Sequence, residues 1–160
     1  MYYISRVEID TNNRRKIANL THLGAYHNWV EISFPEEFST GKRSRKLWRI
    51  DQLRGRNYLL IVSQSEPNIT QLETYGVPGT GQCKAYDGFL KNLKNGQKMS
   101  FRLTANPVRS VMEDGKRGKV YPHITVEKQL EYLEKRAEGL GFSLVEGDYQ
   151  IVQRDFPILR

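Results

Sequence analysis

The sequence is poor in the residues that most directly mark a catalytic or metal site, with one cysteine and three histidines among 160 residues. A single thiol, Cys83, excludes an intrachain disulfide and every zinc motif built on several cysteines. Cys83 lies among loop residues (GTGQCK) with no obvious base beside it, so we interpret it as incidental. His22 and His27 lack a third strong ligand at suitable spacing. We therefore expect no metal site and no cofactor.

Long apolar runs are also missing. No stretch approaches the roughly 20 residues that a membrane-spanning helix needs. The N-terminal residues, MYYISRVEID, carry charges where a signal peptide would need an apolar segment. We expect a protein without a membrane partner that stays in the cytoplasm. The glycine-rich segment 76–81 has no GK[ST] and does not join a strand to a helix, so it is interpreted as a plain loop.

Basic residues are abundant and unevenly placed. There are 25 Lys and Arg against 18 Asp and Glu, a net charge of +7. Seven of the basic residues fall between Lys42 and Arg56, where Asp51 is the one acid, and a second cluster occupies 116–119. Such clusters are typical of phosphate-binding surfaces. A solvated, solubilising face has the same composition, so charge alone leaves nucleic-acid binding open.

The first hundred residues have the pattern of a small α+β domain. Residues 2–9 are rich in aromatic and β-branched types and predict a strand. An apolar stripe at spacings of 3 and 4 then predicts a helix that Pro35 ends. The stripe consists of Leu20, Leu23, His27, Val30 and Phe34.

Further strands are predicted at 46–50, 58–62 and 98–104, the last from its clean alternation, with a loop at 74–84 and a short helix at 86–93. The order β, α, β, β, partly helical segment, β is that of a ferredoxin-like domain, shared by many RNA-binding modules. No strand has the aromatic pattern of a standard RNA recognition motif.

A second unit is predicted after a basic, turn-rich linker. We place an N-terminal ferredoxin-like domain at 1–107, the linker at 108–122, and the first part of a second such domain at 123–160. The second part contains a helical stripe from Val126 to Leu140, with Thr125 as its N-cap. Residues 142–145 and 149–152 are predicted to be strands.

Histidine is the residue type best suited to chemistry here. RNA carries its own nucleophile in the 2′-hydroxyl, so groups that titrate near neutral pH can cleave it without a metal. His27 shares its predicted face with four apolar residues, and a histidine in that position is more often a core residue than a catalyst. The residue pattern leaves both interpretations open.

Several motifs taken together resemble the CasE family of CRISPR-associated endoribonucleases, the crRNA-processing subunit of the type I-E Cascade complex. The motifs are YISRV at 3–7, YHNW at 26–29 with Phe34-Pro35 downstream, LWRI at 47–50, FRLTANP at 101–107, KRGK at 116–119, and LEYL at 130–133 before Gly141-Phe142. FRLTANP is the most specific of them.

The resemblance implies two tandem ferredoxin-like domains and metal-independent cleavage of CRISPR repeat RNA at the base of its stem-loop. The products would carry a 2′,3′-cyclic phosphate and a 5′-hydroxyl, and the protein would stay with its crRNA among the other Cascade subunits. The family's catalytic histidine lies seven residues before a Phe-Pro pair, a spacing that selects His27. His27 would then point from the inward face toward a cleft.

Two positions depart from the family pattern. Some members have a tyrosine three residues before the histidine and a lysine five after it, where this chain has Gly24 and Ile32. Tyr26 or His22 is the expected substitute for the second proton-transfer group. The alternative function is an RNA-binding subunit that cleaves weakly or not at all. The family also continues some 50 residues further, so we expect the second domain to be incomplete here.

The expected phosphate contacts are cationic and gather mainly in two segments. They are Lys42, Arg43, Arg45, Arg109, Lys116, Arg117, Lys119 and Arg160.

Overall fold

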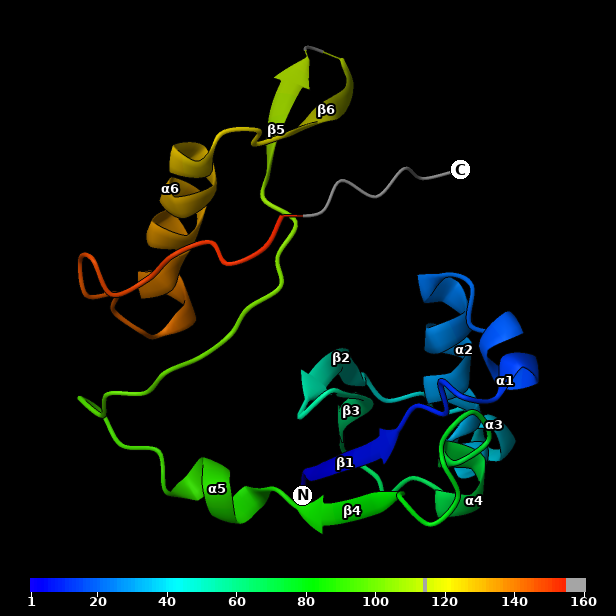
Figure 1. Ribbon diagram of the computed structural model, residues 1–160. Helices are drawn as coiled ribbons and strands as arrows, with labels where there is room; N and C mark the ends of the chain where they lie inside the picture. Colours follow the sequence, from blue (N-terminus) through cyan, green and yellow to red (C-terminus); the bar gives the residue numbers. More distant parts are fainter. Residues whose placement is uncertain (114, 155–160) are drawn as a thin grey trace. The chain divides into compact units, whose positions relative to one another are not determined.

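The computed structural model describes residues 1–113 and 115–154. The chain divides into two units, Met1–Lys98 and Met99–Arg160. Both combine helices with antiparallel strands (Figure 1). The predicted α+β class is therefore confirmed.

A four-stranded antiparallel sheet is the framework of the first unit. Its strands are β1 (Tyr3–Glu8), β2 (Leu47–Leu53), β3 (Arg56–Ser63) and β4 (Gln82–Ala85). They lie in the order β2-β3-β1-β4, so the two central strands are the first and third in sequence. This is the ferredoxin-like order that the sequence predicted. The hairpin predicted from LWRI onward is β2–β3, closed by a turn at Arg54 and Gly55, both at positive φ.

Five helices accompany the sheet, and the first four gather on one side of it (Figure 1). They are α1 (Arg14–Ala18), α2 (Leu23–Ile32), α3 (Pro35–Thr40), α4 (Ile69–Leu72) and α5 (Asp87–Lys91). Pro35 ends the pattern of α2 as predicted, but it also begins α3, because proline suits the first turn of a helix, where no amide hydrogen is needed.

The core lies between the sheet and these helices. Strand residues alternate, so Val7, Leu59 and Ile61 are fully buried while their neighbours are more exposed. Trp29 of α2 and Leu72 of α4 complete the centre of this cluster. The indole Nε1 of Trp29 donates a hydrogen bond of 2.9 Å to the backbone oxygen of Leu72. This bond satisfies the one polar atom of a side chain that has no exposed surface.

The buried face of α2 differs from the predicted one. Tyr26, Trp29, Val30 and Ser33 form the inward stripe, whereas His27 is exposed and Leu23 keeps 69% of its surface. The large indole occupies the inward position and so determines which way the helix is rotated. His27 consequently lies on the solvent side, and the expectation that it faces inward was wrong.

The glycine-rich loop after α4 packs closely against β1. Val77 N donates to Glu8 O at 2.8 Å, and Asp10 N donates to Tyr75 O at 3.1 Å. A Cβ at Gly76 would lie 2.3 Å from a methyl carbon of Val7. Only glycine fits at this distance, so the glycine serves packing.

The strand predicted at 98–104 is absent. These residues form no regular structure, and Met99, Phe101 and Leu103 each keep more than half of their surface. Alternation makes a strand only where a neighbouring strand accepts its hydrogen bonds, and both edges of β1 are already occupied by β3 and β4. The ring of Phe101 instead contacts that of Phe142, with centroids 5.3 Å apart.

The second unit contains a hairpin followed by a helix. The hairpin consists of β5 (Val108–Glu113) and β6 (Lys116–Pro122), so the expectation of an irregular linker at 108–122 was wrong. Its β-branched residues were outweighed in the sequence pattern by the charges between them. The helix is α6 (Val126–Ala137), capped by Thr125 as predicted, and a 3-10 turn follows at Glu138–Leu140. The strands predicted at 142–145 and 149–152 are not formed.

Replacing Trp29 with alanine tests the assignment of the inward face. We expect Trp29→Ala to lower the free energy of unfolding by about 3–5 kcal/mol, because it leaves a cavity and an unpaired carbonyl. Leu23→Ala on the same helix should change it by less than about 0.5 kcal/mol, because that side chain is exposed. Urea denaturation measures both, and similar losses would refute the observed rotation of α2.

Candidate functional site

His27 lies on an exposed stripe of α2. Gly24, His27, Asn28 and Glu31 recur at helical spacing, and the first three are exposed. Side chains on a helix lean toward its N-terminus, so the imidazole of His27 leans toward the turn that contains Gly24. An accessible imidazole with a reference pKa of about 6.5 can approach a bound RNA and exchange protons near neutral pH.

His22 is the N-cap of α2 and not a free surface residue. Its backbone is extended, with φ −153° and ψ 162°, and its Nδ1 accepts a hydrogen bond of 3.2 Å from Ala25 N. This bond satisfies one of the amide groups that lack a partner at a helix start. The ring also lies over Gly24, whose Cβ, if present, would be 2.9 Å from Nδ1.

Tyr26 belongs to the packing of the first unit. Its ring is stacked on Trp48, with centroids 6.3 Å apart and planes 16° apart, and it also contacts Trp29. Burial raises the pKa of the phenol, which makes proton release at neutral pH less favourable. Consecutive helical residues also point about 100° apart, so Tyr26 and His27 do not face one another.

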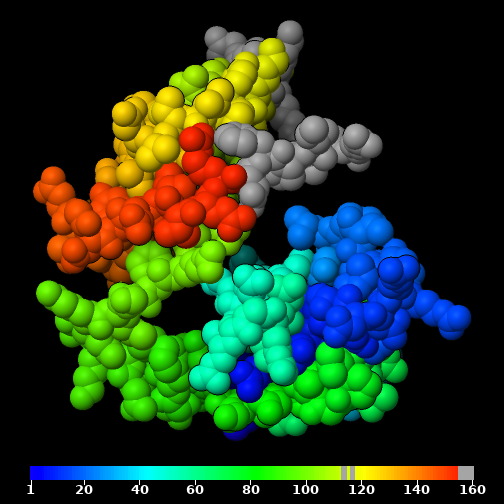
Figure 2. All heavy atoms as spheres, in the orientation of Figure 1, coloured from blue at the N-terminus to red at the C-terminus, as the bar shows by residue number. Residues whose placement is uncertain are grey.

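The basic loop, residues 41–46, presents three cations to solvent. Lys42, Arg43 and Arg45 are exposed, and the guanidinium of Arg43 lies over the ring of Phe38 at 4.6 Å. Lys46 differs, because its side chain has 2% of its surface exposed. The loop leads into the β2–β3 hairpin, whose turquoise atoms are visible on the surface shown in Figure 2.

A buried ion-pair network anchors the basic loop. Lys46 Nζ lies 2.8 Å from Glu37 Oε2 and 3.4 Å from Glu31 Oε1. The other oxygen of Glu37 accepts hydrogen bonds from the hydroxyls of Ser44, at 2.6 Å, and Ser65, at 2.8 Å. Burial opposes ionisation of Glu37, but the hydrogen bonds from Lys46 and the two serines outweigh it and lower its pKa to about 2. The network therefore ties the loop to α2, α3 and the end of β3.

Other cations of the basic segment make ion pairs within the sheet. Arg49 lies 2.5 Å from Asp51, and Arg56 lies 3.1 Å from Glu8. These pairs help to hold the hairpin and its central neighbour together.

The remaining cationic candidates belong to the second unit. Arg109 of β5 is exposed and lies over the ring of its cross-strand partner Tyr121, at 5.9 Å. Lys116, Arg117 and Lys119 lie on β6. Arg160 lies outside the described residues. The predicted site residues thus fall into two groups, one on α2 and the basic loop and one on the β5–β6 hairpin.

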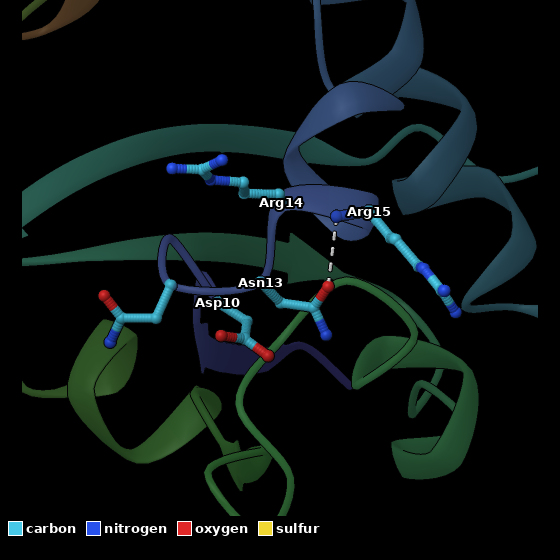
Figure 3. A pocket seen from close by; sticks show the side chains of 5 residues that line it. Asp10, Asn13, Arg14 and Arg15 are labelled. Carbon is cyan, nitrogen blue, oxygen red and sulfur yellow. Dashed lines mark hydrogen bonds between the residues drawn. The ribbon is translucent and has the colours of Figure 1, made fainter.

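A shallow polar depression lies where β1 leads into α1 (Figure 3). Asn13 caps α1 through its side-chain oxygen, which accepts from Arg15 N at 3.1 Å, while the side chains of Arg14 and Arg15 point in different directions. Asp10 pairs with Lys16 at 3.2 Å. Its polar groups serve a turn and a helix cap, and we assign it no chemistry.

The described part of the chain lacks two kinds of feature. Among its residues, no helix is long and apolar enough to cross a membrane. Within 1–113 and 115–154, His, Cys, Asp and Glu side chains form no group of three that could hold a metal ion.

Comparison with known proteins identifies the family. The model of the family described as CRISPR associated protein matches residues 2–159. The chain belongs to this family. It is 34% identical over 149 residues to the CRISPR-associated endoribonuclease Cse3 of Thermus thermophilus, an alignment that covers 89% of this chain and 65% of Cse3. The chain therefore spans slightly less than two thirds of that relative.

Solved structures of Cse3 have the same fold. A CRISPR endoribonuclease Cse3 bound to a 19-nucleotide RNA matches with a TM-score of 0.73 at 26% identity, over 95% of this chain and 71% of the other. Thermus thermophilus Cse3 bound to an RNA representing a pre-cleavage complex matches with a TM-score of 0.72 at 25% identity, over 92% and 69%. The family resemblance inferred from the sequence motifs is thus confirmed for this CRISPR associated protein.

Sequence reasoning missed the network around Lys46 and the contact between Gly24 and His22. Lys46 looked like another surface cation, since nothing in its spacing distinguishes it from Arg45. The pair Glu36-Glu37 in the first turn of α3 was a usable signal for a buried partner, because a buried lysine needs an acid.

Replacing Glu37 with glutamine tests the anchor. The variant leaves Lys46 with a weaker partner, and we expect a loss of about 1.5–3 kcal/mol in the free energy of unfolding at pH 7. Because the folded-state pKa of Glu37 is depressed, its contribution is present above about 4.5 and is lost as pH falls toward about 2. Thermal unfolding of both proteins from pH 7 to pH 2 should therefore converge. A constant difference across this range would contradict the assignment.

Proposed function

We propose that this chain belongs to a metal-independent endoribonuclease that cleaves CRISPR repeat RNA at the base of its stem-loop. The single observation that carries the proposal is an exposed His27 on α2 of a ferredoxin-like domain, in a family member similar to Cse3, which is an endoribonuclease. The exposure favours catalysis over a core role, because a structural histidine on this helix would face the sheet.

The chemistry requires no metal. The 2′-oxygen attacks the adjacent phosphorus, the bond from phosphorus to the 5′-oxygen breaks, and a 2′,3′-cyclic phosphate and a 5′-hydroxyl result. One proton leaves the 2′-hydroxyl and one reaches the 5′-oxygen. His27 serves as general base in the first transfer or as general acid in the second, a contribution typically worth about 10²- to 10⁴-fold.

The cations supply the binding surface. Lys42, Arg43 and Arg45 project from a loop that Lys46 anchors, so their charges are held in place beside α2. We assign them to phosphate contacts, together with Arg109 and the cationic residues of β6. Such contacts grip the backbone and the shape of the stem, while the folded RNA supplies most of the sequence specificity. We further propose that the protein keeps its crRNA and joins other Cascade subunits.

A second candidate function is RNA binding with weak cleavage or none. The observation that favours it is that Ile32, where some family members have a lysine, is half-buried and carries no ionisable group. The two functions differ in turnover and share the binding surface.

Replacing His27 with alanine tests the enzymatic proposal. Cognate repeat RNA is incubated with protein in EDTA under single-turnover conditions, and the 3′ ends of the products are analysed. We expect the wild type to give a cyclic phosphate and His27→Ala to be slower by about 10²-fold or more, with little change in RNA affinity. Asn28→Ala on the same exposed stripe is the matched control.

Each result has a distinct meaning. Binding without cleavage by the wild type supports the second function. A requirement for a divalent metal contradicts the mechanism, and equal rates for wild type and His27→Ala contradict the assigned residue.

Replacing Lys42, Arg43 and Arg45 together with alanine tests the phosphate contacts. For every phosphate that the variant no longer neutralises, the slope of log K against log salt concentration should fall by about 0.7–0.9, depending on the RNA form bound. We expect weaker binding that is less salt-dependent, measured by filter binding between low and moderate salt. An unchanged slope would remove the basic loop from the interface. Replacing Arg14 and Arg15 is the charge control.

A further inference from the structure

The hydrogen bond at the start of α2 determines the protonation state of His22. Nδ1 accepts the amide hydrogen of Ala25 at 3.2 Å, so this nitrogen carries a lone pair and no proton. The other ring nitrogen, Nε2, then carries the proton of the neutral imidazole. A protonated ring would place a hydrogen on Nδ1, lose the cap and add positive charge at the positive end of the helix. The cap therefore favours a neutral imidazole with an Nε2–H donor.

The same contact brings His22 to the exposed stripe of His27. The ring of His22 lies over Gly24, with Nδ1 2.9 Å and Cε1 3.0 Å from the point where a Cβ would be. Gly24 and His27 are three residues apart, and side chains at that spacing start about 5–6 Å from one another. The side chain of His27 also leans toward this turn. The absence of a side chain at Gly24 thus allows two imidazoles to occupy neighbouring positions on one accessible surface.

We propose that His22 binds the scissile phosphate as a neutral hydrogen-bond donor and takes no part in proton transfer. This inference rests on the proposed function. While the cap holds, one ring nitrogen of His22 is occupied by Ala25 and the other already carries a proton, so neither can accept one. Donation from a neutral imidazole would produce an imidazolate, which is far too basic at neutral pH.

A neutral donor matches the charge that develops in the reaction. As the 2′-oxygen attacks and the bond to the 5′-oxygen breaks, negative charge increases on the non-bridging oxygens of the phosphate. A positioned N–H that strengthens its hydrogen bond at that moment lowers the barrier, and removing such a donor typically costs about 10²- to 10³-fold in rate. The proton balance of the reaction stays with His27 and solvent.

Replacing His22 with asparagine separates the chemistry from the cap. Asparagine is among the best N-cap residues, so the variant keeps α2 intact but lacks the reach of the imidazole. We expect a melting temperature close to that of the wild type and single-turnover cleavage slower by about 10²-fold. Cleavage by His22→Asn at the wild-type rate would overturn the proposal.

Sulfur substitution in the RNA identifies what His22 contacts. With a phosphorothioate at one non-bridging oxygen of the scissile phosphate, the wild type should be slowed for one diastereomer, and His22→Asn should lose this preference. With sulfur at the 5′-bridging position the leaving group needs no proton. Restoration of the wild-type rate to His22→Asn by that substrate would mean that His22 is a general acid, which contradicts the proposal.

Gly24→Ala provides an independent variant. Alanine raises helix propensity, but its Cβ would displace the ring of His22. We expect a cleavage defect of similar size to that of His22→Asn, and no additional defect when both changes are combined. Additive defects would show that the two residues act separately, against the proposal.

Binding distinguishes failure of this inference from failure of the proposed function. A repeat RNA with a 2′-deoxy nucleotide at the cleavage position cannot react, so its affinity reports contacts alone. If the wild type does not cleave, the proposed function fails, and the contact is judged from this RNA: weaker binding by His22→Asn supports it and equal binding overturns it. His27→Ala should bind this RNA like the wild type.

Discussion

Burial of the Trp29 indole is the interaction on which the arrangement of the first unit depends. A side chain of this size can be buried completely only if its N–H finds an acceptor, and Leu72 O provides it at 2.9 Å. That requirement selects which side of α2 faces the sheet. Once Trp29 and Val30 point inward, His27 must point outward, because neighbouring positions on a helix differ by about 100°. Packing thus produces the exposure that the proposed chemistry needs.

Burial also divides the basic loop into an anchor and a surface. Lys46 is withdrawn from solvent and is neutralised by Glu37 and Glu31, whereas Lys42 and Arg45 keep their charges at the surface. A buried cation with two acids and further hydrogen bonds defines one loop conformation, since any other would leave charges unpaired in a medium of low polarity. The charges offered to a phosphate backbone are consequently held by charges that the backbone never meets.

Glycine has two different structural tasks in this unit, and both concern proximity. Gly76 lets a loop approach β1, where a Cβ would collide with Val7, and Gly24 lets the ring of His22 fold over the first turn of α2. In the second case the missing side chain is replaced by a neighbouring one that arrives from the cap position. The departure from the family pattern at Gly24 thereby provides room for a ring that can donate to a phosphate, which compensates chemically for what that position lacks.

The sequence by itself determined the elements whose signals are local and strong. These include the first strand, the β2–β3 hairpin, the Thr125 cap and the family, because propensity, turn residues and motif order are read along the chain. Tertiary structure alone decided the rotation of α2, the burial of Lys46 and the absence of a strand at 98–104. Each depends on what stands opposite: an acceptor for the Trp29 indole, two acids around an ammonium group, or a free strand edge. Such partners are distant in sequence, so periodicity and composition carry no record of them.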